Sequence, residues 1–233
     1  MRRLGVGLAS VLLAVACVVL GGPSAGAATG GGGCQLQGTA NLSPPLSSNS
    51  GNFTYNFTGN LTGCQSNVAG APTSGTVSAG VQLPETVTLT ANTSPPCSGV
   101  PPCTTTGTVQ YQEPTPTGTG SCGSSTTSGH ALATWNDGKH TAVDYTTTGA
   151  LAAVNLQGTV ASSLTLTVVA SSVPAGWTAP STYTINSDEP VFTAGEGALA
   201  QLTFQPTTPD QNCVTVGVSS AAINGFVGIG SAS

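Results

Sequence analysis

Charged residues are scarce in this sequence. Only 5% of its 233 residues are Asp, Glu, Lys or Arg, whereas a typical soluble domain has about 25%. Nucleic-acid binding needs a basic patch, which three Lys and Arg residues cannot form. No window of the chain has the spacing of an amphipathic helix, which argues against helical bundles and coiled coils. The lack of charge also argues against a charged, disordered chain.

The first 27 residues have the organisation of an export signal. Arg2-Arg3 precedes an apolar run that continues to Leu20, and small residues ending at Ala27 form a signal-peptidase site. We therefore predict a signal peptide over residues 1–27 that is cleaved, leaving a chain that does not engage a membrane. Two alternatives are a retained membrane anchor, since the run approaches spanning length, and a lipoprotein modified at Cys17.

Cleavage at this site would remove most of the positive charge. One cation, Lys139, would remain against eight carboxylates. Such an acidic chain disfavours nucleic acid and anionic lipid as partners. We expect a secreted protein that acts in the extracellular space or in association with the cell wall.

Six cysteines follow the expected cleavage site, and an even number in an exported chain predicts disulfides. Six cysteines allow 15 connectivities, and among these we favour the pairs Cys34–Cys64, Cys97–Cys103 and Cys122–Cys213. The second pair closes a short proline-rich loop that cannot continue a strand. Since the cysteines lack C-x-x-C spacing and have no histidine nearby, we expect no zinc site.

The chain from residue 34 onward is rich in β-branched residues and in turn signals about 8–12 residues apart, the pattern of an all-β sandwich or barrel. The predicted strands cover residues 34–41, 52–62, 74–81, 86–92, 105–112, 129–136, 139–147, 152–161, 163–170, 181–186, 197–205, 213–218 and 222–229. We predict one large antiparallel all-β domain over residues 34–233, stapled by disulfides, after a flexible lead-in over residues 28–33. Sandwich and barrel share the same alternation, so both remain open.

Exposed strand edges tend to pair with other chains, and lysine is the usual protection. A single lysine cannot protect a dozen predicted strands. We therefore expect the sheet to close on itself or nearly so, with proline-rich loops covering the remaining edges.

The clearest local signal is a hairpin at Asp137-Gly138. A two-residue turn places Trp135 opposite His140. A three-residue loop shifts the register and places His130 opposite Asp144, where the two side chains can form a hydrogen bond. Neither register brings both histidines around one ion, so we interpret them as structural residues.

Two tryptophans are the candidate ligand-binding residues. Trp135 lies beside the hairpin turn, and Trp177 lies among turn-forming residues. If the rings project from the surface, they can stack on sugar rings, which have an apolar face. The alternative for aromatic residues in such strands is a place in the core.

Signals for catalysis are weak. No G-x-S-x-G elbow occurs. Asp188-Glu189, followed by Glu196, is the main acidic cluster, and its surroundings are typical of a turn. We interpret these residues as solvated turn carboxylates, with calcium binding or paired catalytic carboxylates as alternatives. We expect no enzymatic activity, no cofactor and no metal.

Several segments resemble secreted proteins of high-GC actinobacteria that have no assigned activity. The resemblance rests on the segment 34–38, on the run Phe53-Thr-Tyr-Asn-Phe-Thr-Gly59 and on Leu61-Thr-Gly-Cys64. Trp135-Asn-Asp-Gly138 and the terminal segment 225–230 are similar as well. The resemblance implies an exported β-rich domain and assigns no functional residue.

These observations predict a non-enzymatic structural or interaction protein of the cell envelope or extracellular space. Its partner would be cell-wall polysaccharide or another envelope protein. The alternative is a module that binds a carbohydrate, or a small apolar ligand inside a barrel; a glycan-active hydrolase is third. A filled interior would favour the structural role. An exposed Trp135 or Trp177 beside a groove would favour the binding module. Asp188 or Glu196 in a cleft would favour the hydrolase.

Overall fold

The computed structural model describes residues 31–150 and 153–230. The predicted signal peptide over residues 1–27, the alternative modification at Cys17 and residues 28–30 of the predicted lead-in lie outside this range. Among the described residues, none forms a helix with the length and apolar character needed to cross a membrane. The prediction that the lead-in continues to residue 33 is wrong, because Gly32 and Gly33 already pair within the first strand.

The regular structure is all-β, as predicted, with one short 3₁₀ turn at Ala170–Ser172. The strands are β1 (Gly32–Leu46), β2 (Gly51–Ser66), β3 (Gly75–Ala79), β4 (Gln82–Ala91), β5 (Cys103–Gln112), β6 (Thr117–Ser121), β7 (Ser124–Trp135), β8 (His140–Ala150), β9 (Ala153–Ala161), β10 (Ser163–Val168), β11 (Thr182–Asn186), β12 (Gly197–Pro206) and β13 (Val218–Ile229).

The strand predicted over residues 213–218 is wrong. The Asn212 side chain accepts hydrogen bonds from the backbone N–H groups of Val214 and Thr215, which holds this segment in a turn. Conversely, β6 was not predicted. It has two glycines among its five residues and follows Pro116, so its sequence is typical of a loop.

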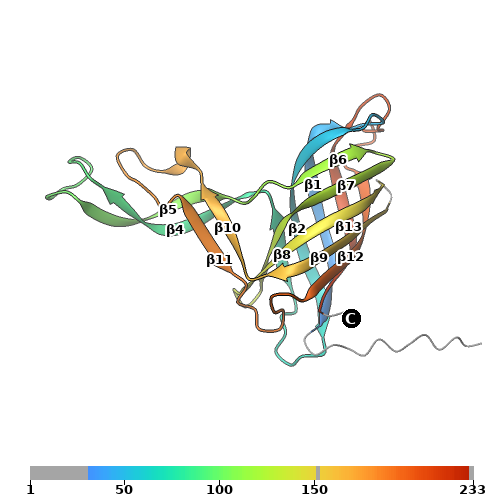
Figure 1. Cartoon of the computed structure of the whole chain (residues 1–233), viewed down its shortest axis with the longest axis horizontal. Coiled ribbons are helices and arrows are strands. Elements are labelled where there is room, and N and C mark those ends of the chain that lie inside the picture. The colour runs from blue at the N-terminus through green and yellow to red at the C-terminus, as the bar shows by residue number, and fades with distance from the viewer. Residues whose placement is uncertain (1–30, 151–152, 231–233) are drawn as a thin grey trace, which may run out of the picture.

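Nine strands form one antiparallel sheet that closes on itself (Figure 1). Their order is β1-β13-β12-β9-β8-β7-β3-β2-β6, and β1 also pairs with β2. Strands β3 and β6 each pair with both β2 and β7, so they share one position in the wall of an eight-stranded barrel. This closure pairs the edges of the sheet, which is the solution expected for a chain so poor in lysine.

Alternation along the strands makes the barrel apolar inside and polar outside. On β2, Phe53, Phe57 and Leu61 are buried, whereas Thr54 and Thr58 between them are exposed. Successive side chains of a strand point to opposite faces. The face that carries the aromatic side chains therefore lines the inside of the barrel.

The other four strands form a separate sheet in the order β11-β10-β5-β4, which extends from the side of the barrel (Figure 1). We call this sheet the wing. Its apolar core includes Leu89, Tyr111 and Leu166, and it packs against Leu132 and Ala142 on the outside of the barrel. The chain beyond residue 34 thus builds a barrel and a second sheet rather than one continuous sheet.

The β7–β8 hairpin has the three-residue loop. The Trp135 N–H donates to the Lys139 carbonyl at 2.8 Å, so residues 136–138 form the loop, with Gly138 at a φ of 86°. His130 consequently lies opposite Asp144, and His130 Nδ1 is 2.6 Å from Asp144 Oδ1. The register with Trp135 opposite His140 is wrong.

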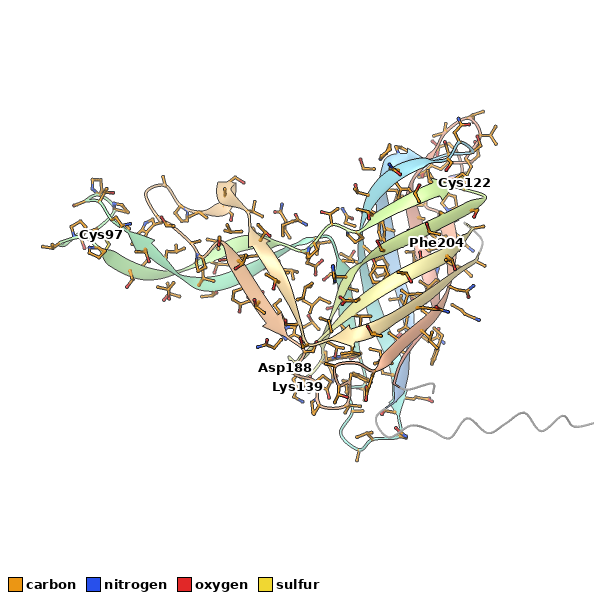
Figure 2. All side chains as sticks on the ribbon, in the orientation of Figure 1. Cys97, Cys122, Lys139, Asp188 and Phe204 are labelled. Atoms are coloured by element: carbon orange, nitrogen blue, oxygen red, sulfur yellow. A yellow bond between two sulfur atoms is a disulfide. The ribbon has the colours of Figure 1, made fainter. Side chains whose placement is uncertain are left out.

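All three predicted disulfides are confirmed. Cys34–Cys64 joins β1 to β2, Cys97–Cys103 closes the tip of the wing, and Cys122–Cys213 ties the β6–β7 turn to the loop after β12 (Figure 2). Three structural disulfides indicate an oxidising compartment of the extracellular type.

Candidate ligand-binding cavity

The interior of the barrel contains a cavity of about 160 Å³. Apolar side chains from strands around the barrel line it, among them Leu36, Leu42, Phe57, Ile223 and Val154. Space arises where inward positions carry small side chains; Ala40, Ala79, Ala131 and Ala133 all face the cavity. Protein interiors are normally close-packed, with few voids larger than a water molecule, so a cavity of this size is an unusual feature.

Four hydroxyl groups form a hydrogen-bonded chain in the lining. Tyr55 Oη is 2.6 Å from Tyr145 Oη and 3.1 Å from Thr127 Oγ1, which in turn is 2.7 Å from Thr147 Oγ1. All four side chains line the cavity. Gly129 lies opposite Tyr145, and a Cβ there would be 2.7 Å from Pro116 Cβ and 2.9 Å from the Tyr145 hydroxyl. The glycine therefore makes room for the Pro116 ring and the Tyr145 hydroxyl.

The two tyrosines remain protonated donors. Burial raises the pKa of Tyr55, and the hydrogen bonds from Thr127 and Tyr145 oppose this in part. Burial, the neighbouring Tyr55 and the Glu113 carboxylate together raise the pKa of Tyr145 further still. The cavity is thus apolar with a neutral hydroxyl chain on one side.

One end of the barrel is covered by the segment between β11 and β12. We call residues 187–196 the plug, and the end that it covers the hairpin end, because the β7–β8 turn lies there. Phe192 is buried and its ring centroid lies 5.1 Å from that of Trp135. The indole Nε1 of Trp135 donates to Thr141 Oγ1 at 2.8 Å. The indole is therefore fixed by this hydrogen bond and by its contact with the Phe192 ring.

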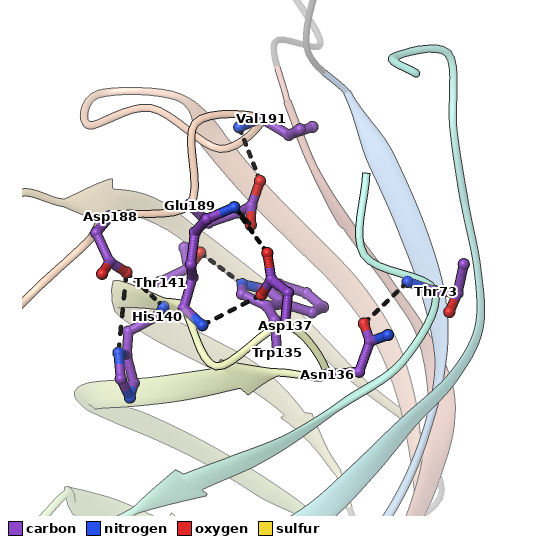
Figure 3. Close-up of polar contacts among 10 residues, drawn as sticks. Thr73, Trp135, Asn136, Asp137, His140, Thr141, Asp188, Glu189 and Val191 are labelled. Carbon is purple, nitrogen blue, oxygen red and sulfur yellow. Dashed lines mark hydrogen bonds and ion pairs between the residues drawn. The ribbon is translucent and has the colours of Figure 1, made fainter. Parts of the chain in front are cut away.

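The acidic residues of the plug attach it to the β7–β8 turn (Figure 3). The His140 N–H donates to Asp188 Oδ1 at 2.7 Å, and the N–H groups of Asp188 and Glu189 donate to the His140 carbonyl. Glu189 is 2% exposed; its Oε1 accepts from the Val191 N–H, and its Oε2 lies 3.5 Å from Lys139 Nζ. The only cation beyond the predicted signal peptide therefore lies against a buried carboxylate of the plug.

Comparisons of this chain with protein-family models, with curated proteins and with solved structures find no match. Its function must therefore be inferred from its fold and from the geometry of its cavity.

The structure does not present Trp135 as a surface ring. Trp135 is 4% exposed and belongs to the barrel core, because it shares the inward face of β7 with Ala133. Its expected projection from the hairpin is wrong. Trp177 is partly buried and packs against the core of the wing, so the two tryptophans lie in different apolar clusters.

The acidic cluster is structural in its geometry. Asp188 and Glu189 accept backbone N–H groups as described, and Glu196 accepts from the N–H and hydroxyl of Thr193 at 3.1 and 3.0 Å. Within residues 31–150 and 153–230, no group of three or more His, Cys, Asp or Glu side chains is placed to hold a metal ion. The turn that was predicted at these residues is thus used to hold the plug in place.

A second hollow of about 640 Å³ lies outside the barrel, between residues 114–117 and strands β7 to β9. His130 and Asp144 line it together with the hydroxyls of Ser128 and Thr146. The carboxylate orients the imidazole through Nδ1. In the described part of the chain, no hydroxyl or thiol forms a hydrogen bond with the other ring nitrogen.

The junction between barrel and wing contains a buried carboxyl that the sequence did not single out. Glu113 is 1% exposed; it accepts from the Ser78 hydroxyl at 2.6 Å and from the Val81 N–H at 3.0 Å. Gln112 next to it donates to the carbonyls of Gly80 and Val81. These contacts hold the connection between β3 and β4 beside the segment that follows β5, where both pass between barrel and wing.

We expect Glu113→Gln to change how stability depends on pH. Burial raises the pKa of Glu113, and its two hydrogen bonds oppose this in part. The native state therefore holds this proton more tightly than the unfolded state, so the stability of the wild type falls as pH rises from the unfolded pKa through the raised one. The glutamine can accept from Val81 and donate to Ser78, and it should remove that fall in urea unfolding measured between pH 4 and pH 8.

Asp210→Asn is the control, because the pH dependence that Asp210 gives to stability has the opposite sign to that of Glu113. A hydrogen bond from Thr208 lowers the pKa of Asp210, so its contribution to stability is lost as pH falls. The asparagine variant should lose stability less steeply than the wild type on acidification. Parallel pH profiles for Glu113→Gln and the wild type would contradict a buried, proton-retaining Glu113.

Proposed function

We propose that this chain is an exported binding protein that holds a small apolar molecule inside its barrel. The observation that carries the proposal is the cavity of about 160 Å³ in the closed barrel, lined by apolar side chains. Eight-stranded barrels are either filled by their own side chains or hold one small ligand. An empty cavity loses dispersion contacts over its whole lining, and an apolar ligand restores them.

Other features agree with this role. The N-terminal export pattern and the three disulfides support release into an oxidising compartment. The hollow interior favours ligand binding over the purely structural role, which would be served by a filled barrel. Carbohydrate binding through an exposed Trp135 has lost its support, since the ring is buried. A cell-wall polysaccharide or envelope protein as partner stays a prediction from the sequence.

The test is to fill the cavity from within. Ala131 lies on the inward face of β7 and lines the cavity. We expect toluene to bind the wild type, as detected by saturation-transfer NMR. In Ala131→Leu the added side chain should occupy the same space, weaken toluene binding at least tenfold and leave the melting temperature unchanged or higher.

Ala222→Leu is the matched control, because Ala222 on β13 lies between the inward-facing Ala221 and Ile223 and points outward. It should bind toluene like the wild type. Failure of the wild type to bind toluene, or equal binding by Ala131→Leu and the wild type, would refute a ligand site inside the barrel.

A further inference from the structure

The hydroxyl chain in the cavity has one donor more than it uses. Tyr145, Tyr55, Thr127 and Thr147 each carry one O–H hydrogen. The three hydrogen bonds between them consume three of these four hydrogens. No other described residue accepts from these hydroxyls, so one O–H remains to donate to a further acceptor. The same oxygens retain lone pairs that can accept a hydrogen bond in return.

The surroundings of the hydroxyl chain carry no counter-charge for an ion. Among the described residues that line the cavity, none is Asp, Glu, Lys, Arg or His. Lys139 lies with Asp137 and Glu189 at the hairpin end, outside the lining. The ionisable side chains that act on Tyr145 are Tyr55 and Glu113, and neither is a cation. Moving an ion from water into such a cavity is costly when no partner awaits it.

The size of the cavity limits the ligand. A dry engineered cavity of about 150 Å³ takes up benzene, and the barrel cavity measures about 160 Å³. We propose that the ligand is a neutral molecule with an apolar body about the size of benzene and one oxygen, as in an alcohol, aldehyde or ketone. This oxygen lies against the hydroxyl chain of Tyr55, Tyr145, Thr127 and Thr147. This inference rests on the proposed function, and it adds the chemical class of the ligand.

Four probes of similar size separate the classes: toluene, benzyl alcohol, benzoate and benzylammonium. We expect the first two to bind the full secreted protein at pH 7 and the two ions to bind at least tenfold more weakly than benzyl alcohol. Dissociation constants are measured by titration calorimetry or by competition against toluene in ligand-observed NMR.

The role of the hydroxyl chain is tested with Tyr55→Phe, which removes the hydroxyl that bonds to two neighbours. We expect toluene affinity to stay within a factor of two and benzyl alcohol affinity to fall roughly three- to tenfold, the effect of one hydrogen bond. Thr127→Val interrupts the same chain with little change in volume and serves as the second variant. Tyr183→Phe, in the wing, is the control and should change neither affinity.

The outcomes separate the two proposals. If none of the probes binds, both the ligand site and its chemical class are overturned. Toluene binding together with equally strong benzoate or benzylammonium binding would overturn the neutral class alone. An unchanged ratio of benzyl alcohol to toluene affinity in both hydroxyl variants would overturn the oxygen position while leaving the barrel as an apolar binding site.

Discussion

Phe192→Ala is expected to lower the free energy of unfolding by about 3–5 kcal/mol, the range for removing a large buried aromatic side chain. Phe192 is 4% exposed and lies against Trp135 at the hairpin end of the barrel. Its loss would open a void beside the indole and leave the plug held by its polar contacts and by the buried Val191 side chain. Urea unfolding followed by tryptophan fluorescence measures the change, since Trp135 reports on this contact.

The control is the same substitution at Phe226, which is 53% exposed on the outside of the barrel. Phe226→Ala should change the free energy of unfolding by no more than about 0.5 kcal/mol. Equal losses in the two variants would show that Phe192 does not close the barrel. A small loss in Phe192→Ala would mean that the plug is held mainly by its other contacts, those of Asp188, Glu189 and Val191.

Removal of Cys122–Cys213 by substitution of both cysteines with serine should cost about 4–5 kcal/mol. In the loop-closure account, a disulfide stabilises more when it closes a longer loop. The two cysteines are separated by 91 residues. The Cys122 N–H donates a hydrogen bond to the Ser47 carbonyl, and the Ser48 N–H donates one to the Cys213 carbonyl. The bridge therefore ties the loops at the end of the barrel opposite the plug.

The comparison for this prediction is the Cys97–Cys103 pair at the tip of the wing, where the separation is only 6 residues. Its replacement by two serines should cost about 2 kcal/mol, about half the effect of the longer loop. Both double variants are measured by urea unfolding under non-reducing conditions. A larger loss at the wing tip than at Cys122–Cys213 would contradict the loop-closure explanation.

Local patterns in the sequence were sufficient for most strands, for the hairpin and for the short-loop disulfide Cys97–Cys103. The alternation of Phe53 and Phe57 with threonine and asparagine defines one apolar face of β2, because strand side chains alternate. Asp137-Gly138 marks the β7–β8 turn. Its register stayed open, since loops of two and three residues both suit that pair. β6 was missed because glycine and proline are typical of loops, although its neighbours β2 and β7 supply the pairing.

The functional interpretation of single residues was less predictable. Trp135 shares its face of β7 with Ala131 and Ala133, but only the closed barrel shows that this face is the inside. The hydroxyl chain joins side chains up to 90 residues apart. No local pattern marks such a contact. Gly129 lies opposite Tyr145 only in the β7–β8 register that the structure shows.

The sequence by itself determined the all-β class, the two alternating faces of most strands and the expectation that the six cysteines form disulfides. The first two follow from alternation and turn chemistry, which act over a few residues, and the third follows from the even cysteine count of an exported chain; the structure supplied the connectivity. The tertiary structure alone decided between sandwich and barrel, showed that a wing leaves the barrel wall, and showed that a cavity with a chain of four hydrogen-bonded hydroxyls remains inside. Closure depends on pairs such as β1 with β13, whose residues lie at opposite ends of the described chain. The cavity depends on the summed volume of side chains from strands around the barrel, which no single segment of the sequence specifies.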